Sequence, residues 1–270
     1  MLTVTNICKT FNAGTANEVR ALRDVSVHLP AGAFLIILGG NGSGKSTLLN
    51  AVAGTFPLDE GKIQLSGENI TRLPEHRRAR LIGRVFQNPF TGTAPDMSIA
   101  ENFALAARRG QRRGLGWALN RRLKDELRDR VRELRMGLED RLDTAIGSLS
   151  GGQRQALTLL MATWLKPALL LLDEHTAALD PKSADLVIRA TAEIVSRHQL
   201  TTLMVTHSMQ QAVNLGDRIV MMHRGAVACR FEGADKQRLR VQDLLGRFED
   251  LRRREMLDES AAALLEKTYV

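Results

Sequence analysis

The sequence predicts an α/β protein in which helices cover a sheet of mostly parallel strands. Three observations indicate this fold. Apolar runs of strand length alternate with helical segments from Phe34 onward. The runs Phe34 to Leu38 and Ala168 to Leu172 are apolar at every position, which is typical of strands buried on both faces. The first run leads through a glycine-rich loop into a helix, as in a phosphate-binding strand, loop and helix unit.

Each element follows from local patterns of apolar, β-branched and turn-forming residues. The expected strands are Leu2 to Ile7, Val25 to Leu29, Phe34 to Leu38, Ile63 to Leu65, Ile82 to Phe86, Ala168 to Leu172, Thr201 to Thr206, Arg218 to Met222 and Ala226 to Arg230. The expected helices are a basic one near Glu75 to Arg80, then Ser98 to Ala107, Asn120 to Met136, Gln153 to Lys166, Pro181 to Ser196, a short one from Ser208, and an amphipathic one within Val241 to Val270.

The glycine-rich loop fills every fixed position of the pattern G-x-x-x-x-G-K-[ST]. Glycines allow backbone N–H groups to approach a polyphosphate, and the N-terminus of the following helix adds a partial positive charge. Lys45 can reach the outer phosphates, and the Ser46 hydroxyl can bind Mg²⁺. The alternative is a plain glycine-rich turn. The predicted phosphate-binding residues are Gly39, Asn41, Gly42, Ser43, Gly44, Lys45, Ser46 and Thr47.

Composition limits the class of protein. A chain of 270 residues fits one large α/β domain with an appendage, or two small domains. No stretch approaches the roughly 20 apolar residues of a membrane span, so we expect a soluble, cytosolic chain. Cys8 and Cys229 stand far apart in the sequence, which favours neither a disulfide nor a zinc site.

Positive charge is concentrated between Arg108 and Arg135, which hold eleven Lys and Arg against four Asp and Glu, in a chain of net charge +8. One interpretation is a solvated helix face with ion pairs such as Glu126 with Arg130. The other is a lobe that faces anionic lipid or the acidic loops of a partner.

Phe11 is expected in a polar loop between the first two strands. There its ring could stack on the face of an adenine, or pack on its own sheet. The sequence favours neither.

Four further motifs follow the glycine loop: Leu149 to Gln153, Leu169 to Glu174, Ala177 to Asp180, and His207 after an apolar strand. With these five motifs in this order, residues 2 to 230 resemble the ATP-binding cassette (ABC) ATPases. The resemblance implies a P-loop NTPase fold with a mixed sheet core, N-terminal antiparallel strands and a helical subdomain between Gln87 and the signature motif. The implied domains are an ABC ATPase domain over 1–230, with its helical subdomain at about 88–165, and a C-terminal helical appendage over 231–270.

The resemblance also assigns roles to residues near the loop. Asp173 would hold Mg²⁺ through its water shell, together with Ser46 and Gln87. Glu174 would orient and partly deprotonate the attacking water as general base. His207 could donate a hydrogen bond to the terminal phosphate, and Gln87 could reach Mg²⁺ or water while signalling to the helical lobe. The implied catalytic residues are Glu174, His207 and Gln87.

A second anion site is expected at the signature motif, where Ser150, Gly151, Gly152 and Gln153 open a helix. In the family, that site serves ATP bound to the other subunit. Asp180 is a further candidate ATP contact, although Asp180 followed by Pro181 is also a good helix N-cap.

Two positions depart from the family pattern. His175 replaces the common proline after the catalytic Glu, and Ala177 replaces a frequent Ser. Neither change removes a phosphate ligand, but both leave the subunit interface uncertain. The stretch Asp173 to Lys182 is similar to a subgroup of bacterial importer ATPases, some of them linked to aromatic amino acids.

The resemblance implies the ATPase subunit of a bacterial transporter, peripheral on the inner face of the membrane. It would form a homodimer that sandwiches two Mg·ATP and drives separate transmembrane permease chains. An importer with a periplasmic solute-binding protein is favoured. An exporter, a lipid-extraction system and a regulatory membrane complex remain open.

The rival class is a soluble cassette ATPase that acts on DNA or ribosomes. Members linked to translation resemble two cassettes in one chain, which 270 residues cannot hold. Those acting on chromosomes carry a long coiled coil, whereas only 61 residues separate Gln87 from Leu149. We therefore expect no nucleic acid partner.

Overall fold

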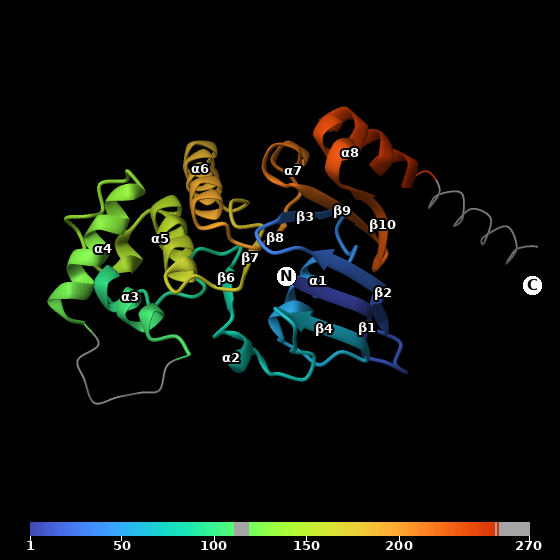
Figure 1. Ribbon diagram of the computed structural model, residues 1–270, viewed down its shortest axis with the longest axis horizontal. Helices are drawn as coiled ribbons and strands as arrows, with labels where there is room; N and C mark the ends of the chain where they lie inside the picture. The colour runs from blue at the N-terminus through green and yellow to red at the C-terminus, as the bar shows by residue number, and fades with distance from the viewer. Residues whose placement is uncertain (111–118, 252, 254–270) are drawn as a thin grey trace, which may run out of the picture.

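A computed structural model describes residues 1–110, 119–251 and 253. Two sheets enclose a helix, α1 (Lys45–Ala53) (Figure 1). The smaller sheet has the order β2-β1-β4-β5 and the larger one the order β10-β9-β3-β8-β7-β6. The strands are β1 (Leu2–Phe11), β2 (Val19–Leu29), β3 (Phe34–Gly39), β4 (Glu60–Leu65), β5 (Glu68–Asn69), β6 (Ile82–Val85), β7 (Leu169–Asp173), β8 (Thr202–Val205), β9 (Arg218–His223) and β10 (Ala226–Phe231).

Most of the other helices cover the outer face of the larger sheet or build a lobe beside it, and α2 (Glu75–Arg78) lies near the C-terminal end of α1 (Figure 1). The remaining helices are α3 (Ile99–Ala107), α4 (Arg121–Glu133), the 3-10 turn Ile146–Ser148, α5 (Gly151–Thr163), α6 (Pro181–His198), α7 (Met209–Leu215) and α8 (Gly233–Arg238). A further helix over 241–251, which we call the tail helix, follows α8.

The α/β fold with a mixed sheet is confirmed. Strands β6, β7, β8, β3 and β9 run parallel, β10 runs antiparallel to β9, and the N-terminal strands pair antiparallel. The expectation that Phe11 lies in a polar loop is wrong. Strand β1 continues to Phe11, which pairs with Val19 of β2. The short elements β5 and α8 are not expected from the sequence.

The core has three parts that reflect these layers. Apolar side chains from both sheets and α1 fill the space between the sheets. The outer face of the larger sheet packs against α5, α6, α7 and the tail helix. The lobe of α3, α4 and α5 has its own core, where Phe103 and Trp164 meet edge to face at 5.4 Å between ring centroids.

The helix α4 in the basic segment carries the expected ion pair on an exposed face. Arg130 lies 2.7 Å from Glu126, and a further pair joins Arg132 to Asp129 at 3.1 Å. These pairs favour the solvated-face interpretation for this helix. Residues 111–118 of the basic segment, and most of the predicted C-terminal helix beyond Leu251, lie outside the described residues. Across the described residues, no helix has both the length and the apolar composition that crossing a bilayer requires.

The position of α1 depends on a buried arginine. Arg78, only 2% exposed, donates to the carbonyls of Ala51 and Val52 at the C-terminal end of α1, each at 2.8 Å. It also donates to the carbonyls of Leu73 at 2.7 Å and Thr71 at 3.0 Å. Since the last carbonyls of a helix lack partners within it and carry partial negative charge, a guanidinium there satisfies them and complements the dipole.

We expect Arg78→Met to destabilise the fold by about 3 kcal/mol, because it leaves buried carbonyls without donors. Arg77→Met is the matched control, since Arg77 is exposed on the same short helix. Urea unfolding followed by circular dichroism measures both variants. Equal stability of the two would show that the Arg78 bonds do not hold α1 in place.

Candidate functional site

Four loops that carry predicted site residues leave the same edge of the larger sheet. The phosphate-binding loop follows β3, Gln87 follows β6, Glu174 follows β7 and His207 follows β8. The register places these strand ends side by side, since Ile37 and Asp173 both pair with Val205, and Leu172 pairs with Val85. Ligands of α/β sheets bind at the carboxyl ends of the strands, and the candidate site therefore lies at this edge.

Lys45 occupies the interior of the phosphate-binding loop. Its Nζ donates to the carbonyls of Gly39 at 3.0 Å and Gly40 at 2.9 Å, and its side chain is 5% exposed. Burial lowers the pKa of Lys45, while the carboxylates of Glu174 and Asp173 act in the opposite direction. The ammonium is thus held by neutral acceptors in a position from which it can turn to phosphate.

The conformation of the phosphate-binding loop requires glycine at positions 39 and 44. A Cβ on Gly39 would lie 2.4 Å from the Met222 carbonyl, and one on Gly44 would lie 2.6 Å from the Ala21 carbonyl. Gly44 also has φ +97° and caps α1 without a side chain. This geometry leaves the first-turn N–H groups of α1, which have no intrahelical acceptor, available to an anion.

Glu174 and His207 form a pair, with 2.7 Å between Oε1 of the carboxylate and Nε2 of the imidazole. The side chain of Glu174 is 12% exposed and its φ is +43°, in the left-handed region. A non-glycine residue persists there only when its surroundings fix it. The second carboxylate oxygen, Oε2, remains on Glu174 as an acceptor for water.

Asp173 has a partner that the sequence did not indicate. Arg84 of β6 lies 3.6 Å from its Oδ2, donates to Asn50 Oδ1 at 2.5 Å, and stacks on Phe86 at 4.5 Å. Burial raises the pKa of Asp173, and Arg84 opposes that rise. The sequence signal that could have pointed to Arg84 is a charged residue within a short, otherwise buried strand, which needs a partner of opposite charge.

The residues present fit a magnesium ion held jointly with phosphate. Ser46 and Asp173 supply a hydroxyl and a carboxylate, the oxygen donors that Mg²⁺ prefers, and Mg²⁺ usually keeps waters and uses only one or two protein ligands. Within the described chain, no group of three or more His, Cys, Asp or Glu could hold a metal alone. The donor set therefore suits Mg²⁺ that arrives with nucleotide.

Phe11 packs within its own part of the fold, and its stacking on adenine stays a prediction. Its ring packs edge to face on Phe56, with 5.2 Å between centroids, and Lys9 lies 5.6 Å from its centre. It also lines a hollow of about 590 Å³ beside the phosphate-binding loop. Three arginines that sequence reasoning missed line the same hollow: Arg20, Arg23 and Arg224.

Gln87 lies at the same edge of the sheet, beyond the end of β6, whereas the signature motif lies apart from the phosphate-binding loop. Gln87 is exposed, two residues beyond β6, and the carbonyl before it accepts a bond from Gln155 of α5 at 2.9 Å. Ser150 is the exposed N-cap of α5, where its Oγ and the Gln153 side chain form a capping box. Of the described residues, none from 149–153 lines either hollow beside the loop, and Figure 1 shows α5 well separated from α1.

Asp180 is the N-cap of α6, as its alternative interpretation predicts. Its carboxylate accepts from the Ser183 N–H at 3.0 Å, and Pro181 occupies the first helical position. Hydrogen bonds from Ser183 lower the pKa of Asp180. Capping does not preclude a contact with ATP, which stays a prediction.

His175 is fully buried behind the Glu174 pair. Its Nε2 lies 3.0 Å from Thr191 Oγ1, and that hydroxyl donates to the Val187 carbonyl at 2.8 Å. The single hydroxyl proton is therefore used, so His175 must carry its proton on Nε2. Burial lowers the pKa of His175 to about 4. The residue that replaces the common proline is thus a neutral core side chain.

Comparison with known proteins gives consistent relatives. The family profile described as "ABC transporter" matches residues 22–177. The tyrosine transport ATP-binding protein of Clostridioides difficile is 40% identical over 92% of this chain and 99% of its own length. The sulfate/thiosulfate import ATP-binding protein of Nocardia farcinica is 37% identical over 84% of this chain. Only 63% of that longer relative is spanned.

Solved structures with a similar fold include two ATP-binding cassettes. A dimeric cassette in a post-hydrolysis state, bound to ADP and phosphate, has a TM-score of 0.72 at 26% identity and covers 86% of this chain and 98% of its own. The ADP conformation of another cassette of an ABC transporter has a TM-score of 0.74 at 25% identity and covers 91% of this chain and 94% of its own.

The buried His175 gives an expected pH dependence. Because its folded pKa of about 4 lies below the unfolded value of 6.5, the unfolded state binds the extra proton as pH falls through this window. The His175 contribution is complete above pH 6.5, and about 2 kcal/mol of it is lost between pH 7 and pH 5. Between pH 7 and pH 5 the free energy of unfolding of His175→Phe should therefore fall by about 2 kcal/mol less than that of the wild type. Urea unfolding at both pH values measures the two decreases. The same loss in both proteins would contradict the assignment.

Proposed function

Because the chain belongs to the family of ABC transporter ATPases, we propose that it binds Mg·ATP at the carboxyl edge of its larger sheet and hydrolyses it to drive a bacterial importer. The observation that carries this proposal is the convergence of Lys45, Asp173 and the Glu174–His207 pair on that edge. A phosphate-binding cation, a carboxylate for Mg²⁺ and a base for water then lie together.

Nucleotide binding rests on the loop and the first turn of α1. Phosphate oxygens would replace the carbonyls of Gly39 and Gly40 as acceptors for Lys45, which exchanges neutral acceptors for anionic ones. The N–H groups at the start of α1 add donors to the same anion. Phe11 would offer its ring to the adenine from the side of the hollow beside the loop.

Hydrolysis rests on the Glu174–His207 pair. When bound, Mg²⁺ neutralises charge on the phosphates, and Ser46 and Asp173 are the residues that would hold it. Glu174 would accept a proton from water through the oxygen that His207 leaves available. His207, about half exposed, can turn from Glu174 toward a terminal phosphate.

The signature motif is proposed to act in a second copy of the chain. Ser150 and the N-terminus of α5 form an exposed anion site without a lysine, and they lie away from the loop of their own chain (Figure 1). A homodimer in which each signature faces the partner's loop would use both sites. That one of the similar structures is a dimer supports this arrangement.

The transport partners are inferred from the relatives. The matched proteins are named for transport of tyrosine and for import of sulfate, thiosulfate and methionine. We infer separate transmembrane permease subunits, a place at the inner face of the membrane, and a periplasmic solute-binding protein. The similarity to the tyrosine protein over almost its whole length favours an amino acid or a similar solute. A neighbouring gene for a multi-span permease would support this inference, and its absence would favour a non-transport ATPase.

We expect Glu174→Gln to keep nucleotide binding and to lower ATP turnover by at least about 100-fold, because water loses its base while every phosphate ligand remains. Phosphate release measures turnover, and equilibrium binding of a fluorescent ATP analogue is the control for an intact site. Nearly normal turnover with intact binding would remove Glu174 from the role of base.

The shared site can be tested with two defective chains. Lys45→Ala removes a phosphate-binding cation, and Ser150→Arg blocks the signature by its bulk. If the sites are shared, a mixed dimer contains one complete site made from the intact loop of one chain and the intact signature of the other. We therefore expect the mixture to form ATP-dependent dimers that neither variant forms alone, measured by size-exclusion chromatography with Glu174→Gln in both chains.

This test needs a reference for a dimer held by one ATP. A mixture of Lys45→Ala with chains whose loop and signature are intact, all carrying Glu174→Gln, also has a single complete site and must give a measurable mixed dimer. Once it does, the absence of dimers from the two defective chains would count against the shared-site arrangement.

A further inference from the structure

The tail helix presents one apolar face to the rest of the chain. Its start is capped, since the Arg240 N–H donates to Asp243 Oδ2 at 2.8 Å. Leu244 is fully buried in the apolar cluster on the outer face of the larger sheet, and Phe248 and Leu251 pack against the same cluster. Leu245 points away and is 45% exposed. The helix is therefore seated through a defined face, with Phe248 at its middle.

The segment before the tail helix is fastened to the same side of the sheet. Lys236 of α8 donates through Nζ to the Val213 carbonyl of α7 at 2.6 Å. Glu232, just before α8, pairs with Arg218 of β9 at 2.5 Å. These bonds fix the approach of the chain to the tail helix independently of Phe248.

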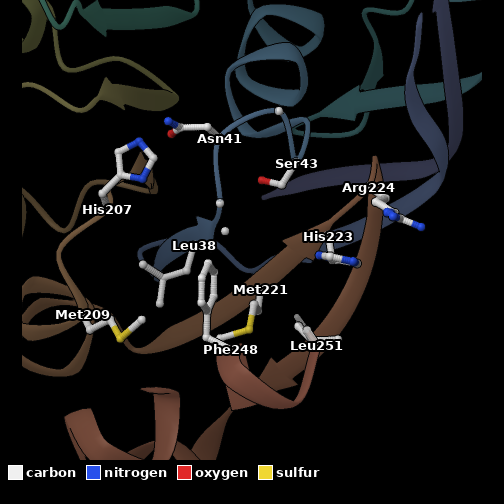
Figure 2. Close-up of a pocket in the computed structure, with 13 residues that line it drawn as sticks. Leu38, Asn41, Ser43, His207, Met209, Met221, His223, Arg224, Phe248 and Leu251 are labelled. Carbon is white, nitrogen blue, oxygen red and sulfur yellow. The ribbon is translucent and has the colours of Figure 1, made fainter. Parts of the chain in front are cut away.

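Phe248 lies next to the phosphate-binding loop. A Cβ placed on Gly40 would lie 3.4 Å from Phe248 Cζ, the one contact within 4 Å of that position among the described residues. The carbonyl of Gly40 accepts from Lys45 Nζ at 2.9 Å. Figure 2 shows the ring between Leu38 and Met221, pointing toward the loop, and the ring and the loop both line a hollow of about 480 Å³. The carbonyl of Gly40 thus accepts from the ammonium, and the space beside its Cα that a side chain would enter is bounded by the ring.

We propose that Phe248 is a positioning residue for nucleotide binding, which holds the Gly40 segment in the conformation that receives phosphate. This inference rests on the proposed nucleotide site. Gly39 and Gly44 are confined by backbone carbonyls of β9 and β2, but Gly40 meets a side chain from a separate helix. The shape of the loop therefore depends on where the tail helix lies. Displacement of that helix lowers the affinity for nucleotide without a change in any phosphate ligand.

The test is the affinity of the full chain for a fluorescent methylanthraniloyl derivative of ADP with Mg²⁺, which requires no turnover. We expect Phe248→Ala to weaken binding about fivefold, the scale of a lost set of van der Waals contacts. Phe248→Leu should retain most of the affinity, because it keeps an apolar side chain against the loop. Leu245→Ala is the matched control, from the exposed side of the same helix, and should bind as the wild type does.

Unfolding temperatures for each variant separate positioning from general loss of stability. Weaker binding by Phe248→Ala at a temperature where it is fully folded supports the proposal. Equal affinity of folded Phe248→Ala and wild type overturns it, as does an equal loss in Leu245→Ala. If neither the wild type nor Lys45→Ala binds the ADP derivative, the result instead refutes the nucleotide site on which the proposal rests.

A second measurement decides the case if Phe248→Ala does not fold. Gly40→Ala adds a methyl group that faces the ring. Phe248→Leu changes the side chain that faces Gly40, while an apolar residue still packs the tail helix against the sheet. In a double-mutant cycle, the loss of affinity in the double variant is compared with the product of the losses in the two single variants. A difference of at least about twofold shows that the two positions act on binding through each other. Additive effects overturn the proposal.

Discussion

The constraint on which the site depends is the register of strand β8 between its two neighbours. Val205 pairs with Ile37 on one side and with Asp173 on the other, so one residue sets the distance between the phosphate-binding loop and the Glu174–His207 pair. A shift of one residue would turn every side chain of β8 to the opposite face of the sheet. The apolar clusters on both faces exclude such a shift, because Met204 and Val205 belong to different clusters.

At this edge of the sheet, the cost of burying charged side chains is offset in part by their attraction to one another. The cation of Lys45 and the carboxylate of Asp173 are each partly removed from water, which disfavours the charged form of each group taken alone. Their proximity, with Arg84 beside Asp173, compensates part of that cost. Phosphate brings negative charge and Mg²⁺ brings positive charge to these three side chains and Glu174, four groups whose own charges nearly cancel. The site can therefore accept both together more readily than either alone.

The sequence predicted the elements and the motifs because those signals are local. Glycine spacing, apolar runs and caps such as Ser98, Ser150 and Asp180 act within a few residues of the chain. Contacts between distant segments were not predictable in this way. Arg84 reaches Asp173 only because β6 pairs with β7, and Phe248 reaches Gly40 across some 200 residues of sequence. Phe11 was placed wrongly because polar residues around it hid the extension of β1.

The contact between α5 and α6 ties two motifs to each other. A Cβ on Gly152 of the signature would lie 2.6 Å from the Cβ of Ser183, in the first turn of the helix that Asp180 caps. A larger side chain at position 152 would clash with residue 183 unless that residue moved away, and Ser183 already has a small side chain. A larger residue at position 152 would therefore need a smaller one at position 183. The stretch 150–153 and the stretch 180–183 pack as one unit, although 26 residues of sequence separate them.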